Sequence, residues 1–155
     1  MCGVMDWFQR AKLIFEVPRP EHFVDPLHCC ECAEKDETLR AHGVDSIGRD
    51  QLGYPGSDPI AFSSVAGIMY YMPALIQLTL DTIDSPDEMY IDQFLFHLIR
   101  DGSGNELVAV CNADQRRMVS GFLEYLIGHY GPQIDARVFS ADQILKAHEI
   151  WHVAE

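Results

Sequence analysis

Three observations in the amino-acid sequence predict an all-α fold. Apolar residues recur at intervals of three and four, most clearly over 118–130, which is the period of an amphipathic helix. Residues 62–82 are apolar in nearly every direction around a helix, which predicts a central buried helix. The β-like run at 107–111 has no partner strand in view. We therefore expect one all-α domain over residues 1–155, a bundle of about five or six helices with a long loop at 44–61.

The first part of the chain predicts two helices with a loop between them. Residues 5–16 place apolar side chains at helical spacing, and two prolines soon after them stop the helix. Residues 17–28 then read as a loop. A second, mostly polar helix is expected to begin near His28 or Cys29 and to end at Gly43, because glycine commonly follows a helix C-terminus.

The middle of the chain predicts the long loop and then the central helix. Residues 44–61 are rich in Gly, Pro and Asp, so we expect a helical turn at 46–51 followed by irregular backbone. Loops of this length in compact domains are often functional or mobile. Pro73 lies inside the apolar segment 62–82. It predicts either a kinked helix or two helices, the second with proline at its first position.

The last part of the chain predicts three more helices. Residues 89–99 form an amphipathic helix, and 107–111 is expected to be an extended piece. A long helix should begin after Asn112, which resembles the start of a capping box, and close at Gly131. The final helix should be capped by Ser140 and run to the C-terminus.

The composition argues against several classes of partner. The formal net charge is −13, from 24 acidic and 11 basic residues, and it predicts an acidic, well-solvated surface. Nucleic acid and anionic lipid are themselves negative, so we expect neither to bind this chain. The N-terminus lacks a signal-peptide pattern, and the longest apolar run is too short to span a bilayer. We therefore expect a cytoplasmic protein with reduced thiols, for which the odd number of five cysteines also argues.

One five-residue stretch, His28-Cys29-Cys30-Glu31-Cys32, holds three of the five cysteines. Thiolate and imidazole are the usual protein ligands of zinc, and the spacing of Cys29 and Cys32 is half of a structural zinc site. The other ligands must come from elsewhere, and His28, His22 and His42 are near in sequence. A cysteine at a helix N-terminus also acquires a lowered pKa, so Cys29 could act as a reactive thiol. The remaining alternative is that these cysteines only pack the inner face of a weak helix.

The second candidate is His148-Glu149-Ile150-Trp151-His152 near the end of the chain. In metalloproteases the H-E-x-x-H spacing puts two histidines on one helical face around zinc, with the glutamate as general base. Only three residues follow His152, so a downstream third ligand has no room. The alternative is a pair of half-buried histidines at the edge of the core. If the second and last helices were neighbours, both motifs together would form a closed Cys2His2 set.

Three sequence blocks resemble a family of small bacterial proteins of unknown function. They are a His-Cys-x-Glu-Cys block at 28–32, a Gly-x-Asp-Pro loop at 56–59 and a Tyr-Tyr-x-Pro-Ala-Leu helix at 70–75. The resemblance covers roughly residues 20–130, so the terminal H-E-x-x-H lies outside it. It implies a bacterial, cytoplasmic protein and draws attention to these blocks, but it implies no activity.

The sequence holds no complete catalytic motif. We therefore expect a non-enzymatic helical domain that binds a partner protein, with a structural metal at His28, Cys29 and Cys32, zinc being the candidate. The alternatives are a zinc-dependent hydrolase that uses His148 and His152, and a thiol-dependent protein that uses Cys29.

Overall fold

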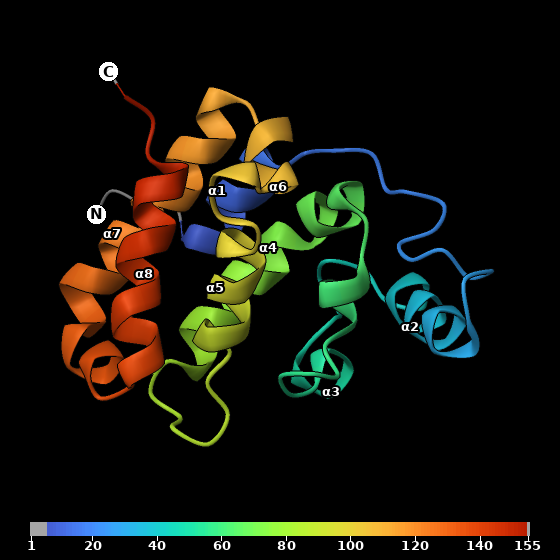
Figure 1. Ribbon diagram of the computed structural model, residues 1–155, viewed down its shortest axis with the longest axis horizontal. Helices are drawn as coiled ribbons and strands as arrows, with labels where there is room; N and C mark the ends of the chain where they lie inside the picture. Colours follow the sequence, from blue (N-terminus) through green and yellow to red (C-terminus); the bar gives the residue numbers. More distant parts are fainter. Residues whose placement is uncertain (1–5, 155) are drawn as a thin grey trace. The chain divides into compact units, whose positions relative to one another are not determined.

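The structure, a computed structural model, describes residues 6–154 apart from the side chains of Val138 and Phe139. All of its regular structure over these residues is helical, in eight α-helices and two short 3-10 helices (Figure 1). The prediction of an all-α fold is confirmed. The chain forms two compact units, Met1–Leu78 and Thr79–Glu155, and the sequence boundary between them falls within the long helix Val65–Thr82. The expectation of one domain over 1–155 stays a prediction, and each unit is described on its own.

The first unit builds its core around the start of α4. Its elements are α1 (Trp7–Ile14), α2 (Cys30–Arg40), α3 (Arg49–Leu52), η1 (Pro59–Phe62) and the first part of α4 (Val65–Thr82). Fully buried side chains include Phe23, Leu39, Leu52, Ile60 and Tyr71. The aromatic rings of Phe23 and Tyr71 lie 5.2 Å apart, centroid to centroid, and join the loop before α2 to the central helix.

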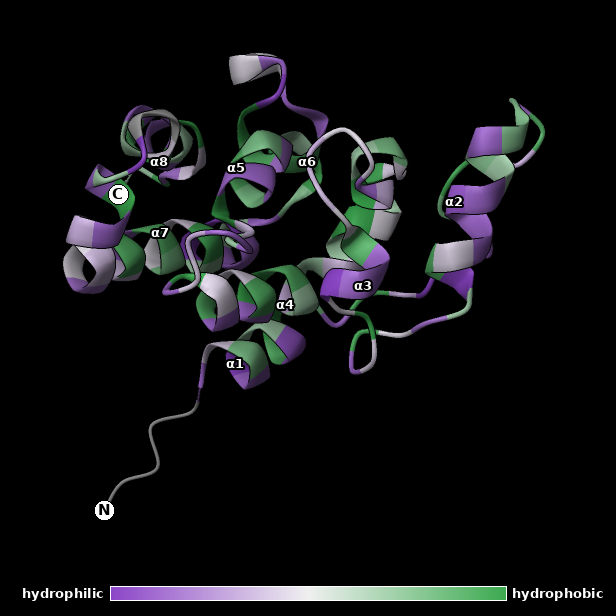
Figure 2. Cartoon of the chain, turned by 90° about the horizontal axis from the view of Figure 1, so that it is seen from below, coloured by the Kyte–Doolittle hydropathy of each residue, from purple (hydrophilic) through white to green (hydrophobic). Residues whose placement is uncertain are grey.

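Helix α2 is mostly hydrophilic, as its colouring in Figure 2 shows. It begins at Cys30 with Cys29 as its N-cap, within two residues of the predicted start. Only Asp36 and Leu39 of this helix are buried. The predicted first helix is also present, although Met5, at its predicted start, lies outside the described residues.

The 44–61 segment contains α3 near the predicted helical turn at 46–51, and it is less irregular than predicted because it also contains most of η1. Both helices have a local cause. The Gln51 side chain accepts from the Gly48 backbone N–H at 2.8 Å, and the Asp58 carboxylate caps η1 by accepting from the Ile60 N–H at 2.8 Å. Pro73 lies inside α4 without ending it, so of the two alternatives for 62–82 the pair of separate helices is wrong.

The second unit packs its last helix against two others. Its elements after α4 are α5 (Ile91–Ile99), η2 (Gly102–Gly104), α6 (Glu106–Val110), α7 (Ala113–Asp135) and α8 (Val138–Trp151). Helix α8 lies against both α5 and α7. Trp151 is fully buried, and its indole N–H donates to the Leu98 carbonyl of α5 at 3.0 Å. This bond and the burial fix the C-terminal end of α8 on the unit.

Three expectations for this unit are wrong in detail. The run 107–111 is not extended: it forms α6, because the Asn105 side chain caps it by accepting from the Val108 N–H at 2.9 Å. Helix α7 does not close at Gly131 but continues to Asp135 across a non-helical Tyr130 (φ −128°, ψ 25°). Ser140 is not a cap but a buried residue inside α8 that donates to Asp92. Short elements such as α3 and α6 account for the difference between the eight described α-helices and the five or six predicted.

Candidate metal centres

The first candidate centre lies at the N-terminus of α2. Cys29 is the N-cap in extended conformation (φ −168°, ψ 172°), and its Sγ accepts from the Cys32 backbone N–H at 3.3 Å. His28 Nδ1 lies 3.4 Å from Cys32 Sγ. One donor atom from each of the three residues lies within 4.8 Å of the other two. His28 and Cys29 are exposed, and Cys32 is partly buried. The structure thus brings the three candidate side chains together, with Cys29 and Cys32 one turn apart as the helical spacing predicts.

The helix end and the neighbouring imidazole favour a thiolate on Cys29. Hydrogen bonds from the Cys32 backbone N–H, then from the His28 side chain, lower the pKa of Cys29 to about 7. The hydrogen bond with Cys29 raises the pKa of Cys32, and the same thiolate raises the pKa of His28. At pH 7 about half of the Cys29 thiols are therefore ionised, whereas Cys32 keeps its proton. Because the thiolate is the form that binds metal ions, one ligand is ready at neutral pH.

A buried carboxylate fixes the loop that leads to this centre. Asp36 of α2 is 2% exposed, and one of its oxygens accepts from the backbone N–H groups of Phe23 at 2.6 Å and Val24 at 3.1 Å. Its other oxygen lies 2.7 Å from His22 Nδ1. The Phe23 carbonyl in turn accepts from the Ser64 N–H at 2.7 Å. The loop is therefore tied to α2 and to the segment before α4.

The hydrogen bonds to Asp36 determine its ionisation. Burial alone would raise the pKa of this carboxyl, but the bonds from His22, Val24 and Phe23 outweigh burial and lower the pKa. Asp36 is thus a carboxylate that organises the backbone. Nearer the centre, the Asp25 side chain accepts from the Leu27 N–H at 3.0 Å, which shapes the turn before His28.

The other end of α2 is held as firmly. The Tyr71 hydroxyl shares its one proton between the carbonyls of Leu39 and His42, whose oxygens lie 2.6 Å and 2.8 Å from the hydroxyl oxygen. The Arg19 guanidinium donates to the Arg40 carbonyl at 2.8 Å and to the Tyr70 hydroxyl at 2.9 Å. Carbonyls at a helix C-terminus have no partner within the helix, so these donors satisfy them. The weakly apolar α2 is therefore held at both ends by polar contacts.

The donor set of the first centre fits a borderline or soft metal ion. Two sulfurs and one imidazole nitrogen are the ligands that zinc prefers, and a tetrahedral site needs one more. The four described cysteines, which also include Cys30 and Cys111, are free thiols. Burial raises the pKa of Cys111 to about 12, so that residue is an inert core thiol.

The second candidate centre lies in the second unit, on α7 and α8. His148 Nε2 lies 2.8 Å from Glu124 Oε2, and the rings of His148 and His152 stack with 5.4 Å between centroids. One donor atom from each of the three lies within 4.8 Å of the others. The predicted histidine pair is thus on one face, with a carboxylate that the sequence analysis missed. Glu124 carries no local signal, because it precedes His148 by 24 residues.

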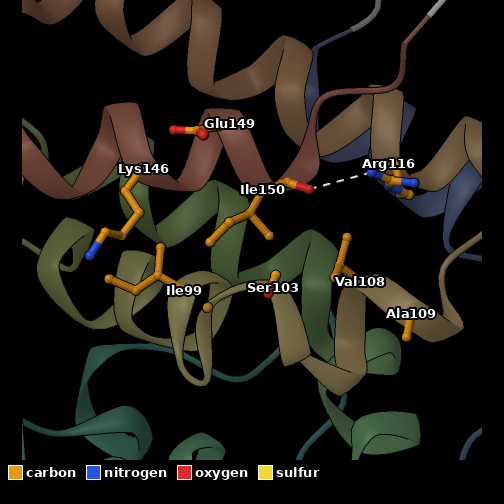
Figure 3. A pocket seen from close by; sticks show the side chains of 9 residues that line it. Ile99, Ser103, Val108, Ala109, Arg116, Lys146, Glu149 and Ile150 are labelled. Atoms are coloured by element: carbon orange, nitrogen blue, oxygen red, sulfur yellow. Dashed lines mark hydrogen bonds between the residues drawn. The ribbon is translucent and has the colours of Figure 1, made fainter.

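The glutamate of the H-E-x-x-H segment has different surroundings. Glu149 lies with Lys146 and Ile150 of α8 at a pocket of about 670 Å³, which also reaches Ser103 and Arg116 (Figure 3). The zinc-hydrolase alternative needs Glu149 next to a metal-bound water. Here the carboxylate in contact with His148 comes from Glu124.

The two centres belong to different units, so the joined Cys2His2 set stays a prediction. Comparisons of this chain with protein-family models, with curated proteins and with solved structures found no match. The resemblance to the bacterial family therefore rests on the sequence blocks alone. In the part of the chain that the structure describes, no helix combines the length and apolar character needed to cross a bilayer.

Proposed function

We propose that this protein is a non-enzymatic zinc-binding helical protein whose metal is held by His28, Cys29 and Cys32. The observation that carries the proposal is the convergence of three donor atoms within 4.8 Å at the N-terminus of α2. The lowered pKa of Cys29 supports it, because the metal then displaces fewer protons at neutral pH. The fourth ligand is a water molecule or a side chain of a partner protein.

The role we propose for the metal is to lock the loop and α2 together. His28 lies on the loop and the cysteines lie at the start of the helix, so a bound ion cross-links the two segments. The helix buries only Asp36 and Leu39, so packing alone gives it little support. Metal binding to preformed ligands stabilises the folded state, because the unfolded chain lacks the site.

The proposal includes a bacterial cytoplasmic setting and a protein partner. The four described free cysteines suit a reducing compartment, and the family resemblance favours a bacterium. The net charge of −13 argues against nucleic acid and anionic lipid as partners. We expect the partner to bind at the exposed ligand cluster and to contribute a side chain as the fourth metal ligand, or to contact the water that occupies that position.

Cobalt substitution tests this site directly. Bound Co²⁺ that is coordinated by thiolates gives a strong near-ultraviolet charge-transfer band, whereas ligation by nitrogen and oxygen does not. We expect the full chain to show the band, and Cys29→Ser or Cys32→Ser to lose most of it. Cys30→Ser is the matched control, since Cys30 lies between them but outside the donor set. A band of equal strength in all three variants would contradict the assignment.

A second candidate function is thiol chemistry at Cys29. It is favoured by the exposed Sγ at a helix N-cap, where it accepts the Cys32 N–H. This function predicts fast alkylation of Cys29 in the metal-free protein near neutral pH. Protection of Cys29 by one equivalent of zinc would support metal binding, and unchanged alkylation in the presence of zinc would support the free thiol as the functional form.

A further inference from the structure

We propose that Glu124, His148 and His152 form a second divalent-metal site, in the second unit and independent of the cysteine centre. The ligand class is a borderline transition-metal dication, with Zn²⁺ as the reference ion, bound by two imidazole nitrogens and one carboxylate oxygen. This site needs nothing from the first unit. It goes beyond the proposed function, because that function concerns only the metal at α2.

The geometry brings three suitable donors together from two helices. Glu124 projects from α7, His148 lies in the last turn of α8, and His152 is the residue that follows that helix. His148 Nε2 lies 2.8 Å from Glu124 Oε2, and the His152 ring stacks on the His148 ring with an angle of 28° between planes. One donor atom from each residue lies within 4.8 Å of the others.

The backbone under these donors is held by packing. Leu123 beside Glu124, Ala147 beside His148, and Trp151 beside His152 are all fully buried. Helices α7 and α8 lie against each other along this face. The Arg116 guanidinium of α7 donates to the His152 carbonyl at 3.1 Å, which ties the residue after α8 to the neighbouring helix. The ligands are therefore presented on rigid elements, which lowers the cost of ordering them on binding.

A metal ion fits between the donors with a small movement. Zinc bonds to nitrogen and carboxylate oxygen of about 2.0–2.1 Å place tetrahedral ligand atoms about 3.3 Å apart. The observed 2.8 Å between His148 Nε2 and Glu124 Oε2 is a hydrogen bond, so these two atoms must separate by roughly half an ångström on binding. The Glu124 side chain is 61% exposed and can move that far by rotation about its own bonds. The ion then replaces the hydrogen bond with two coordinate bonds.

An ion pair between His148 and Glu124 explains only part of the arrangement. It gives no role to His152, whose ring stacks on that of His148. A metal ion, in contrast, draws both imidazoles and the carboxylate to one centre. The C-terminus of α8 carries a partial negative charge that favours a cation there, and the net charge of −13 favours cations generally. Two imidazoles select transition metals over Mg²⁺ and Ca²⁺, which prefer oxygen ligands.

The test must remove the cysteine centre first. We would use the full chain carrying Cys29→Ser, Cys30→Ser and Cys32→Ser, and titrate it with zinc while recording NMR signals of the histidine side chains. We expect this background to bind one zinc ion per chain, with the signals of His148 and His152 shifting together. In this background Glu124→Gln and His152→Ala should each weaken zinc binding by about 10-fold or more, since the loss of even an outer-shell partner costs 10–100-fold.

Two variants serve as matched controls. Glu149→Gln removes an exposed carboxylate one residue from His148, and His129→Ala removes an exposed imidazole from α7; neither residue belongs to the donor set. Both should bind zinc as tightly as the parent. The substituted side chains of Glu124 and His152 are exposed, so circular dichroism should show unchanged helix content. The proposal is overturned if the chain carrying the three cysteine-to-serine substitutions binds no zinc at millimolar concentration. It is also overturned if His152→Ala in that chain binds zinc as tightly as its parent. Either failure leaves the cysteine centre untouched, because the cobalt band reports that centre alone.

Discussion

Replacing Asp36 with alanine should destabilise the first unit and loosen the cysteine centre. The Asp36 carboxylate accepts from the backbone N–H groups of Phe23 and Val24, and it also pairs with His22. Alanine would leave two buried donors without this acceptor. The loop that carries His28 would then lose its tie to α2, so zinc affinity should fall together with stability.

The magnitude follows from the three contacts. A hydrogen bond to a charged group contributes about 1.5–3 kcal/mol, so the two backbone bonds together contribute about 3–6 kcal/mol before the loop relaxes. The contact with His22 adds at most about 1 kcal/mol, because that imidazole is 42% exposed and screened by water. Allowing for relaxation, we expect Asp36→Ala to lower the free energy of unfolding by about 3–5 kcal/mol. Asp36→Asn keeps one acceptor oxygen and should cost about 1–2 kcal/mol.

Urea unfolding followed by circular dichroism measures this effect, with Glu37→Ala as control because Glu37 is exposed on the same helix. The pKa of Asp36 is lowered in the folded protein, so its contribution is fully present above the unfolded value of about 3.9. The contribution is lost as pH falls through the folded pKa. The wild type should therefore lose its advantage over Asp36→Ala in acid. A difference below about 1 kcal/mol at neutral pH, or one that does not shrink in acid, would refute the reasoning.

Three further predictions follow from single contacts. The rate at which iodoacetamide alkylates Cys29 in the metal-free protein should rise with pH around a midpoint of about 7. Cys111, whose pKa is raised to about 12, should react only on unfolding, and equal rates for the two thiols would contradict this. Gly67→Ala should lower the urea midpoint by an amount equivalent to about 1–3 kcal/mol, because a Cβ there would lie 2.7 Å from the Phe23 ring; an unchanged midpoint would show that the ring moves freely. Trp151→Phe should cost about 1–3 kcal/mol in the same assay, from the lost indole hydrogen bond and volume, and a neutral result would mean that α8 is held by other contacts.

Helical periodicity predicted the fold class because the long helices bury regular apolar faces. Periodicity missed α6, because the apolar residues of this short segment are equally suited to a strand. The contact that decides for a helix is the Asn105 cap. It ended α7 too early, because Gly131 and Pro132 look like a stop signal. In the structure the backbone breaks at Tyr130 and then resumes, since proline is tolerated in a first helical turn.

The same distinction between local and long-range contacts decides which site residues could be predicted. His28, Cys29 and Cys32 could be predicted because they lie within one helical turn and the cap geometry is local. The pairing of His148 with His152 is likewise a local, one-turn relation. Glu124 could not be predicted, because it reaches His148 only through the packing of α7 on α8. The anchoring role of Asp36 was equally hidden, since its partners lie 12 to 14 residues earlier in the loop.

The central claim is that the cysteine centre holds zinc, and elemental analysis of the full chain tests it most directly. The protein should be purified without a histidine tag or chelator and then washed with a weak competitor that strips loosely held ions. In the His152→Ala background, which disables the second centre, the account predicts about one zinc ion per chain, lost on adding Cys29→Ser or Cys32→Ser and retained on adding Cys30→Ser. Zinc-free protein that also fails to take up zinc on addition, or zinc that persists in both cysteine variants, would contradict it.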